Sequence, residues 1–240
     1  MSAAETVPPA VAVEALTYAY PDGTRALDAL ELAVAADERV ALLGANGAGK
    51  STLLLHLNGI LACSPKVKIL GLTVEKGNLR EIRRRVGLVF QNPDDQLFCP
   101  TVYDDVAFGP RNLGLSEPEV RDRVRDSLDA VGFGDAAERT SFHLSVGQKK
   151  RVALASVLAM GCEVLVLDEP TSALDPRGRR ELIALLRRIG RTQLIATHDL
   201  DFVAQLCGRA VVLSRGKVVR DESPEAVLGD RALLEAHGLA

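Results

Sequence analysis

The order of hydrophobic and polar residues predicts strands at the start of the chain. Leu30, Leu32 and Val34 occupy every second position, and an unbroken apolar run at residues 40–43 follows them. Alternation is typical of a strand with one buried face, whereas a continuous run suits a strand buried on both faces. The pattern then predicts a helix at about residues 50–61 and strands at residues 67–70 and 86–90.

Residues 93–149 have a different character. Prolines and several glycines interrupt a mostly polar, helix-prone stretch. We interpret this stretch as an inserted helical subdomain. The chain is then predicted to be a single domain over residues 1–240, with its core at about residues 1–92 and 150–240.

Helices and strands alternate again from residue 146 onward. Alternation of this kind predicts a parallel sheet with both faces covered by helices. The predicted elements are strands at residues 164–167, 193–196, 210–213 and 217–219, with a helix at residues 178–189.

The composition is that of an ordinary globular protein. The chain has 240 residues, of which 47% are hydrophobic and 25% charged, enough for one α/β domain. Its formal net charge of -3 and sequence pI near 5.9 argue against binding nucleic acid by neutralising phosphates. The cysteines form no C-x-x-C pair, so no zinc site or disulfide framework is indicated. We expect neither a signal peptide nor a membrane span, because the apolar runs are too short.

The stretch GANGAGKST, from Gly44 to Thr52, has the spacing of a phosphate-binding loop. It lies between a predicted strand and a predicted helix, which is the setting that such a loop requires. Its glycines let successive N–H groups surround phosphates, Lys50 reaches the β- and γ-phosphates, and Ser51 is a ligand for Mg²⁺. The alternative is a glycine-rich turn with a chance lysine, which the flanking strand and helix disfavour.

Two carboxylates end another buried strand, VLVLDE. Asp168 and Glu169 follow its apolar residues, at the edge where ligands of open α/β sheets bind. Asp168 would hold Mg²⁺ through water, and Glu169 would orient and deprotonate the attacking water. Alternatively, either residue caps the turn at Pro170. Because a phosphate loop lies upstream, the metal interpretation is favoured, and a nucleoside triphosphatase is the working hypothesis.

The segment LSVGQ, residues 144–148, precedes a predicted helix. Ser145 and Gln148 have the spacing of a capping box, and a helix N-terminus is also a place where an anion binds. LSVGQ resembles the signature motif of the ATP-binding cassette family, usually Leu-Ser-Gly-Gly-Gln. Other motif positions of that family occur in the expected order along the chain: Tyr20, Gln91, the D-loop that ends at Asp175, and His198. The chain is therefore identified as a member of the family over nearly its whole length.

This resemblance implies a fold and its cofactors. The fold would be an α/β P-loop NTPase (RecA-like) with a parallel-sheet core, an N-terminal antiparallel β subdomain and an inserted α-helical subdomain. ATP and Mg²⁺ are the implied cofactors. The implied ATP-binding residues are Tyr20, which would stack on adenine, Gly44, Asn46, Gly47, Gly49, Lys50, Ser51 and Thr52. The implied Mg²⁺ residues are Ser51, Gln91 and Asp168, and the catalytic residues are Glu169, His198 and Gln91.

The resemblance also implies a dimer. In the family, the signature caps the γ-phosphate held by a second subunit, and the D-loop crosses the interface. The active form would be a head-to-tail dimer with two shared ATP sites, a homodimer being favoured over a heterodimer. The signature residues acting in trans would be Leu144, Ser145, Val146, Gly147 and Gln148, with Asp175 in the D-loop.

Residues 86–116 resemble the ATPase subunits of energy-coupling factor importers, most of all the cobalt and nickel type. In that group the ATPase pair grips cytosolic helices of a transmembrane coupling protein, which carries a substrate-binding membrane protein. The implied location is the cytoplasmic face of the membrane, as a peripheral subunit with no nucleic-acid partner. A groove beside Gln91 lined by Asp94, Asp95, Asp104 and Asp105 would suit cationic helices; the alternative is a solvated acidic loop.

Two alternatives remain: the same ATPase role in a vitamin importer, for example for biotin, and a non-transport ATPase of the family. The second is disfavoured because the chain has neither a coiled-coil insertion nor a tandem cassette. Two departures from the family pattern are notable. Val146 replaces the first glycine of the signature, and Asp37-Glu38 stands where Gly-Glu is usual, so its turn forms without glycine's freedom at positive φ.

Overall fold

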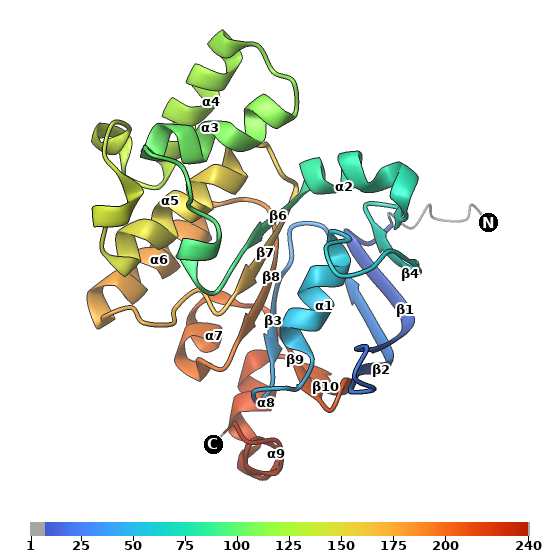
Figure 1. Ribbon diagram of the computed structural model, residues 1–240. Coiled ribbons are helices and arrows are strands. Elements are labelled where there is room, and N and C mark those ends of the chain that lie inside the picture. Colours follow the sequence, from blue (N-terminus) through green and yellow to red (C-terminus); the bar gives the residue numbers. More distant parts are fainter. Residues whose placement is uncertain (1–7, 240) are drawn as a thin grey trace, which may run out of the picture.

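An antiparallel sheet forms the N-terminal part of the molecule, shown in blue and teal on the right of Figure 1. The computed structural model describes residues 8–239. The sheet has the strand order β2-β1-β4-β5. In β2, Leu30, Leu32 and Val34 are buried between exposed neighbours, as the alternation predicted. The strands are β1 (Val11–Ala19), β2 (Arg25–Val34), β4 (Ser64–Ile69) and β5 (Leu72–Val74).

A six-stranded sheet with the order β10-β9-β3-β8-β7-β6 forms the centre of the molecule. Its strands pair in parallel, except that β10 pairs with β9 in the antiparallel sense at one edge. The predicted parallel core is therefore confirmed. The strands are β3 (Arg39–Leu43), β6 (Val86–Val89), β7 (Val164–Asp168), β8 (Thr192–Thr197), β9 (Arg209–Ser214) and β10 (Lys217–Glu222).

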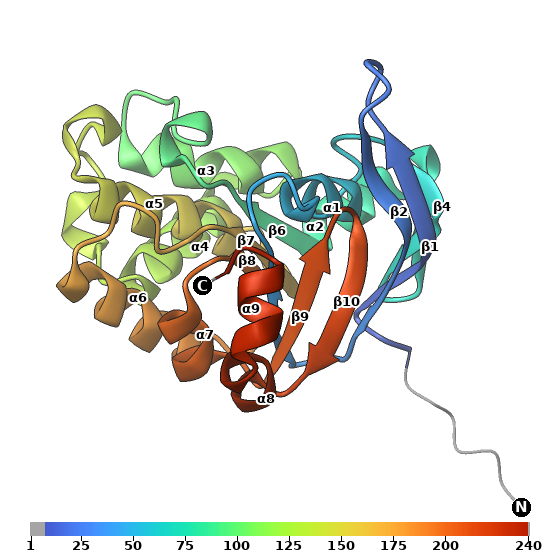
Figure 2. The same cartoon turned by 90° about the horizontal axis from the view of Figure 1, so that it is seen from below.

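Helices cover both faces of this sheet. From below, in Figure 2, α1 lies between the central sheet and the antiparallel sheet, while α3 to α7 lie on the other side. Helix α1 packs against β2, β4, β7 and β8, so it joins the two sheets. The helices are α1 (Lys50–Leu57), α2 (Leu79–Arg85), α3 (Val102–Asn112), α4 (Glu117–Ala130), α5 (Val146–Leu158), α6 (Pro176–Arg188), α7 (Leu200–Leu206), α8 (Pro224–Gly229) and α9 (Arg231–Ala236).

The hydrophobic core is divided by the central sheet into two layers. Along β3, Ala41 and Leu43 pack in one layer, whereas Val40 and Leu42 pack in the other. This division follows from the period of two in a strand, which sends successive side chains to opposite faces. Residues 40–43 of β3 are buried on both faces of the sheet, which explains why this part of the sequence is apolar without interruption.

Helix boundaries differ from the prediction at three places, of which the smallest is α6, at Pro176–Arg188 instead of residues 178–189. Helix α1 ends at Leu57, because Asn58 forms its C-cap and Gly59 takes a φ of 64°. Helix α5 begins at Val146, so the predicted limit of the helical subdomain at residue 149 falls inside a helix. The short helices α8 and α9 were not predicted. Residues 1–7 and 240 of the predicted domain lie outside the described residues.

The turn before β3 is made without glycine, as predicted. Asp37 has a φ of 61°, in the left-handed region that asparagine and aspartate tolerate better than most residues. Its N–H donates to Thr192 Oγ1 at 3.0 Å, which ties the turn to β8. Among residues 8–239, no helix has both the length and the hydrophobicity needed to cross a membrane.

Candidate functional site

A cavity of about 440 Å³ lies where the antiparallel sheet meets the carboxyl ends of the central strands. Sequence segments far apart in the chain contribute to it: the start of β2, the loop before α1, and the ends of β6, β7 and β8. Most of the residues predicted for ATP, Mg²⁺ and catalysis line this one cavity. Its walls are Tyr20, Thr24, Arg25, Ala26, Ala45, Asn46, Gly47, Ala48, Gly49, Lys50, Ser51, Thr52, Gln91, Asp168, Glu169 and His198.

The loop between β3 and α1 depends on glycine at two positions. Gly47 has a φ of 79° and Gly49 a φ of 107°, which other residues rarely adopt. A Cβ on Gly49 would lie 2.5 Å from the carbonyl oxygen of Ala26, so the close approach of β2 also requires glycine. Gly44, predicted as a binding residue, is buried behind the loop and does not line the cavity. The N-terminus of α1 opens toward the cavity, where its free N–H groups favour an anion.

The side chain of Lys50 is almost fully buried in this cavity, with 7% of the residue exposed. Its ammonium donates to the carbonyl oxygen of Gly44 at 2.6 Å and to that of Ala45 at 3.3 Å. It also lies 3.8 Å from Glu169 Oε1. Because it has only backbone acceptors and one distant carboxylate, this cation remains available to an anionic ligand.

Asp168 ends β7 with a carboxylate that is only partly satisfied. Its Oδ1 is buried and has no hydrogen-bond partner among the described residues. Burial raises the pKa of Asp168, and a hydrogen bond from the Ser51 hydroxyl opposes this rise. An orphaned carboxylate oxygen beside a hydroxyl is a suitable ligand set for Mg²⁺, which prefers oxygen. The exposed Gln91 adds an amide to the same cavity.

Ser51, Asp168 and Gln91 are a suitable set of residues for binding Mg²⁺. Within residues 8–239 there is no group of three or more His, Cys, Asp or Glu side chains placed to hold a metal. Mg²⁺ commonly uses one or two carboxylates and completes its shell with water and substrate phosphates. A site of one carboxylate, one hydroxyl and one amide is therefore consistent with an ion that binds together with a nucleotide.

Glu169 is buried and held in a strained backbone conformation. Its φ is 44°, and a left-handed conformation of a non-glycine residue costs on the order of 1–3 kcal/mol. Its Oε2 accepts a hydrogen bond from Thr197 Oγ1 at 3.2 Å and lies 3.0 Å from His198 Nδ1. The carboxylate is thus oriented from β8. Sequence reasoning missed Thr197, although its place at the end of the neighbouring strand was a signal.

Tyr20 lies at the rim of the cavity. Its hydroxyl is 3.0 Å from Thr52 Oγ1, and its ring packs edge-on against Tyr18 with a centroid distance of 5.2 Å. The tyrosine is thereby attached to the helix that carries the phosphate loop. Its predicted stacking on adenine stays a prediction.

The signature residues lie in a different hollow, of about 390 Å³, lined by Ser145, Val146, Gly147, Gln148 and Asp175 among others. The capping box is confirmed: Ser145 N donates to Gln148 Oε1 at 2.9 Å, and Gln148 N to Ser145 Oγ at 3.4 Å. Leu144 is buried and Val146 is 42% exposed. The fold therefore does not bring these residues into the cavity of Lys50 within one chain.

Three consecutive cations after the capping box contact three different elements, which sequence reasoning did not foresee. Lys149 Nζ lies 2.6 Å from Asp94 Oδ1, in the turn after β6. Arg151 forms an ion pair with Glu181 in α6. Lys150 points between them to the turn after β7, where it donates to the carbonyl oxygen of Glu169.

The acidic groove that the sequence suggested is partly wrong. Asp105 is 4% exposed, and its Oδ1 accepts hydrogen bonds from the N–H groups of Phe98 and Cys99 at 2.9 and 2.8 Å. Asp104 lies 3.3 Å from Arg111. Asp105 is therefore enclosed in the loop before α3, and Asp104 is already paired within the chain. Asp95 alone of the four remains exposed without a cationic partner among the described residues.

Comparison with known proteins agrees with this arrangement. A profile of the ABC transporter family matches residues 27–172. The chain belongs to this family and is an ABC-type, ATP-binding ATPase subunit.

Within the family, the chain is 51% identical over 234 residues to the energy-coupling factor transporter ATP-binding protein EcfA of Carboxydothermus hydrogenoformans, covering 96% of this chain and 86% of that protein. It is 50% identical over 237 residues to the cobalt import ATP-binding protein CbiO of Rhodobacter capsulatus, covering 96% and 85%. These relatives confirm the resemblance to the energy-coupling factor group.

Solved structures are also similar. CbiO1 from Clostridium perfringens, part of the ABC transporter complex CbiONQ, superposes with a TM-score of 0.84 at 39% identity, over 97% of this chain and 95% of that one. A dimeric bacterial ABC transporter cassette superposes with a TM-score of 0.79 at 27% identity, over 89% and 98%. The predicted P-loop NTPase fold is therefore confirmed.

Proposed function

We propose that this chain is the ATP-hydrolysing subunit of a membrane importer that takes up cobalt or nickel ions. The single observation that carries the ATPase part is the 440 Å³ cavity, which gathers a phosphate loop, an orphaned Asp168 oxygen and a buried Glu169. The metal-ion substrate is supported by a relative named for cobalt import. Import of a vitamin by the same ATPase role is the alternative, because relatives of similar identity carry only the energy-coupling factor name.

The residues of the cavity have distinct roles in the proposed reaction. Lys50 and the N–H groups at the start of α1 bind the phosphates and stabilise the charge that develops on the γ-phosphate. Mg²⁺, held by Ser51, Asp168 and Gln91, would neutralise phosphate charge when it binds with ATP. Glu169 accepts the proton of the attacking water, and Thr197 keeps its carboxylate oriented through a 3.2 Å hydrogen bond.

His198 is suited to a different part of the same step. Its side chain is 67% exposed at the mouth of the cavity, yet Nδ1 lies 3.0 Å from Glu169 Oε2. Contact with both groups requires an N–H at each ring nitrogen, with Nδ1 donating to that oxygen and Nε2 donating to the γ-phosphate. His198 therefore links the position of the base to the position of the group that is attacked.

We propose that two copies of the chain assemble head to tail around two ATP molecules. The support is the separation of the signature hollow from the phosphate-loop cavity within one chain. The capping box holds the first turn of α5, whose remaining N–H groups open to the hollow and suit the γ-phosphate of a partner. A dimeric solved structure at 27% identity is consistent with this arrangement.

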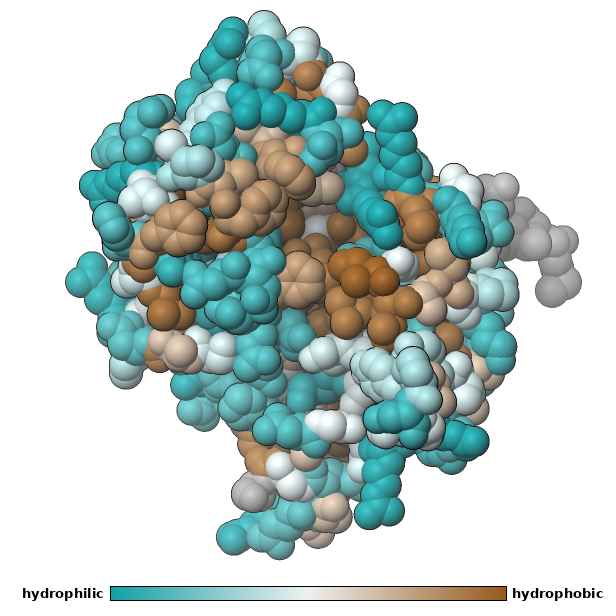
Figure 3. All heavy atoms as spheres, in the orientation of Figure 1, coloured by the Kyte–Doolittle hydropathy of each residue, from teal (hydrophilic) through white to brown (hydrophobic). Residues whose placement is uncertain are grey.

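The proposed membrane partner would bind an apolar surface beside Gln91. Phe98 and Phe108 are 57% and 48% exposed and stack edge-on with centroids 5.0 Å apart. Ile60, after α1, is 50% exposed. Figure 3 shows hydrophobic residues gathered over α3 and over the end of α1, on either side of a hollow. A surface of this kind suits a helix of a transmembrane coupling protein, which would hold the chain at the cytoplasmic face of the membrane.

Purification of the tagged chain from its host membrane tests the importer part of this proposal. The expected result is co-purification of a transmembrane coupling protein and a substrate-binding membrane protein, together with ATP-dependent uptake of radioactive cobalt or nickel. Uptake of biotin without uptake of cobalt or nickel would show that the substrate is a vitamin and not a metal ion. Recovery of the chain without any membrane protein would contradict the importer function.

The docking surface has its own test. Phe98→Ala with Phe108→Ala is expected to abolish co-purification and uptake while the purified chain keeps its ATPase rate within about twofold, because both rings are exposed. Val219→Ala, at an exposed apolar residue of β10, is the matched control. Normal uptake by the double variant would contradict the assigned surface. Asp105 is unsuitable for this test, because reversing a buried charge would disrupt the fold.

A further inference from the structure

The turn that carries Glu169 needs more support than its own backbone supplies. Glu169 and Ala173 have φ values of 44° and 58°, so two non-glycine residues of this short segment are left-handed. Such conformations persist only where surrounding contacts hold them. Part of the support is local: Ser172 donates to the carbonyl oxygen of Glu169 from both its N–H, at 3.1 Å, and its hydroxyl, at 2.9 Å.

The rest of the support comes from Lys150, in the second turn of α5. Its ammonium donates to the carbonyl oxygens of Glu169 and Pro170, both at 3.0 Å, and to Ser172 Oγ at 2.8 Å. Its three N–H donors therefore match three acceptors on consecutive parts of the turn. These contacts span 19 to 22 positions of the chain, so they are tertiary contacts between the signature helix and the catalytic strand.

The ammonium of Lys150 is buried, so its charge carries a cost of desolvation. The residue is 5% exposed, and the partners of its ammonium among residues 8–239 are two carbonyl oxygens and a hydroxyl, with no carboxylate. Burial lowers the pKa of Lys150 to about 8, while the charges of Glu169 and Asp168 oppose this shift. This cost is offset by the three oxygens of the turn, which an apolar side chain of similar length would leave without their donor.

Lys149 and Arg151 provide a contrast within the same helical turn. Their side chains are 15% and 29% exposed, and each is paired with a carboxylate. Lys150 differs because its partners are backbone oxygens of a strained turn. We propose that Lys150 is a positioning residue, whose ammonium holds the Glu169–Ser172 turn in its catalytic conformation and ties it to the helix that begins with the signature.

This inference rests on the proposed function, and it adds a connection between two sites. The signature would engage ATP on the partner subunit, whereas Glu169 acts on the ATP of its own subunit. Lys150 joins the two in one chain. Any displacement of α5 on engaging the partner's nucleotide would therefore be passed to the turn of Glu169 through these three hydrogen bonds.

The experiment compares Lys150→Met, Lys150→Gln and the wild-type chain by hydrogen exchange and by steady-state ATPase kinetics. Methionine keeps the length and removes every donor, whereas glutamine keeps two N–H donors without charge. The matched control is Lys66→Met, because Lys66 also donates to a backbone carbonyl, that of Ala15, but on an exposed sheet. Hydrogen exchange is measured on peptides covering residues 168–175 without nucleotide.

Lys150→Met is expected to speed exchange in these peptides by at least about tenfold and to lower kcat by at least about tenfold, with KM for ATP changed by less than about threefold. Lys150→Gln is expected to recover a substantial part of kcat, and Lys66→Met to match the wild type.

Three results would overturn the inference. The first is unchanged exchange at residues 168–175 in Lys150→Met, which would show that the ammonium does not hold the turn. The second is faster exchange with an unchanged kcat. The third is an equal loss in both Lys150 variants, with the thermal midpoint and KM altered together, because a purely structural role predicts that. Failure of the proposed function is distinguishable, since the wild type and Lys66→Met would then both lack ATPase activity while the exchange result stands by itself.

Discussion

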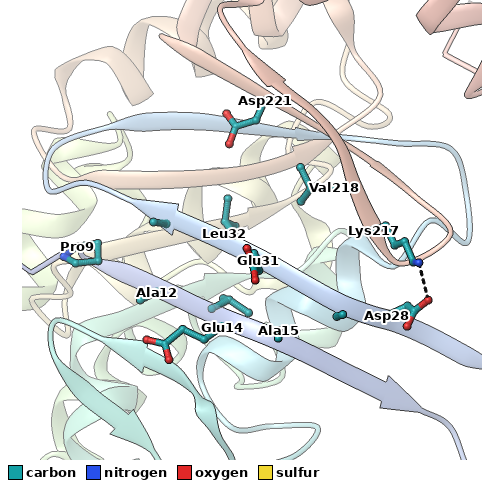
Figure 4. A pocket seen from close by; sticks show the side chains of 13 residues that line it. Pro9, Ala12, Glu14, Ala15, Asp28, Glu31, Leu32, Lys217, Val218 and Asp221 are labelled. Carbon is teal, nitrogen blue, oxygen red and sulfur yellow. Dashed lines mark ion pairs between the residues drawn. The ribbon is translucent and has the colours of Figure 1, made fainter.

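Two hollows of the molecule differ in size and in chemistry. The groove between β1, β2 and β10, shown in Figure 4, has a volume of about 950 Å³, more than the 440 Å³ of the cavity around Lys50. Alanines make up much of its wall. Its charges are largely paired: Lys217 lies 3.1 Å from Asp28, as the dashed line in Figure 4 marks, and Asp221 lies 2.6 Å from Arg209.

The smaller cavity has the opposite character. Asp168 Oδ1 is buried without a partner among the described residues, and the ammonium of Lys50 has only backbone oxygens within hydrogen-bonding distance. Buried polar groups are normally satisfied, so an exception at the end of a central strand indicates a ligand. Between these two hollows, the unsatisfied Asp168 oxygen and not the volume marks the candidate binding site.

The substitution Glu169→Gln is expected to have the largest effect among the tests that distinguish the two hollows. Glu169→Gln keeps the shape of the side chain but removes the proton acceptor, so we expect ATP turnover to fall by at least about 100-fold, with ATP binding retained. Phosphate release by the purified chain is the measurement. Glu31→Gln, at an exposed glutamate of the larger groove, is the control and should retain full activity. Comparable losses in both variants would contradict the distinction between the two hollows.

A smaller effect is expected from the orphaned carboxylate. Asp168→Asn removes the negative charge that would attract Mg²⁺, so the Mg²⁺ concentration for half-maximal ATPase activity should rise by at least about tenfold. The same titration on Asp221→Asn, in the larger groove, should match the wild type, because Asp221 is already paired with Arg209. An unchanged Mg²⁺ requirement in Asp168→Asn would remove Asp168 from the metal site.

The substitution Val146→Gly tests whether valine in the signature impairs ATP turnover. Val146→Gly restores the usual glycine at a position that is 42% exposed in the first turn of α5. We expect turnover by the assembled complex to change by less than about threefold, since Ser145 and Gly147 still present their N–H groups and helix propensity changes little. A large rise in turnover would instead show that the natural signature is impaired by valine.

The smallest effect is expected in the larger groove itself. Lys217→Met breaks the 3.1 Å ion pair with Asp28 on an exposed surface, so kcat and KM for ATP should stay within about twofold of the wild type. The ATPase assay used for Glu169→Gln provides the measurement. A tenfold change would show that this groove communicates with the nucleotide site.

Much of the site was predictable because its signals are local. The spacing of the glycines from Gly44 to Thr52 indicates a phosphate-binding loop, and such a loop lies between a buried strand and a helix. The capping box of Ser145 and Gln148 is likewise contained in four residues, and the structure confirms it. The predicted acidic groove was partly wrong, because the local sequence does not show that Asp105 is buried and accepts backbone hydrogen bonds or that Asp104 is paired with Arg111.

The sequence alone therefore determined the central strands, the phosphate loop and the capping box, since each depends on periodicity or spacing within a few residues, and the order of its motifs along the chain indicated the family. Only the tertiary structure decided which groups meet across the chain. Thr197 reaches Glu169 because β8 lies beside β7, and Lys150 reaches the same turn because α5 packs against β6, the strand next to β7. Such contacts depend on the order of strands and the placement of helices, which the local pattern of residues does not encode.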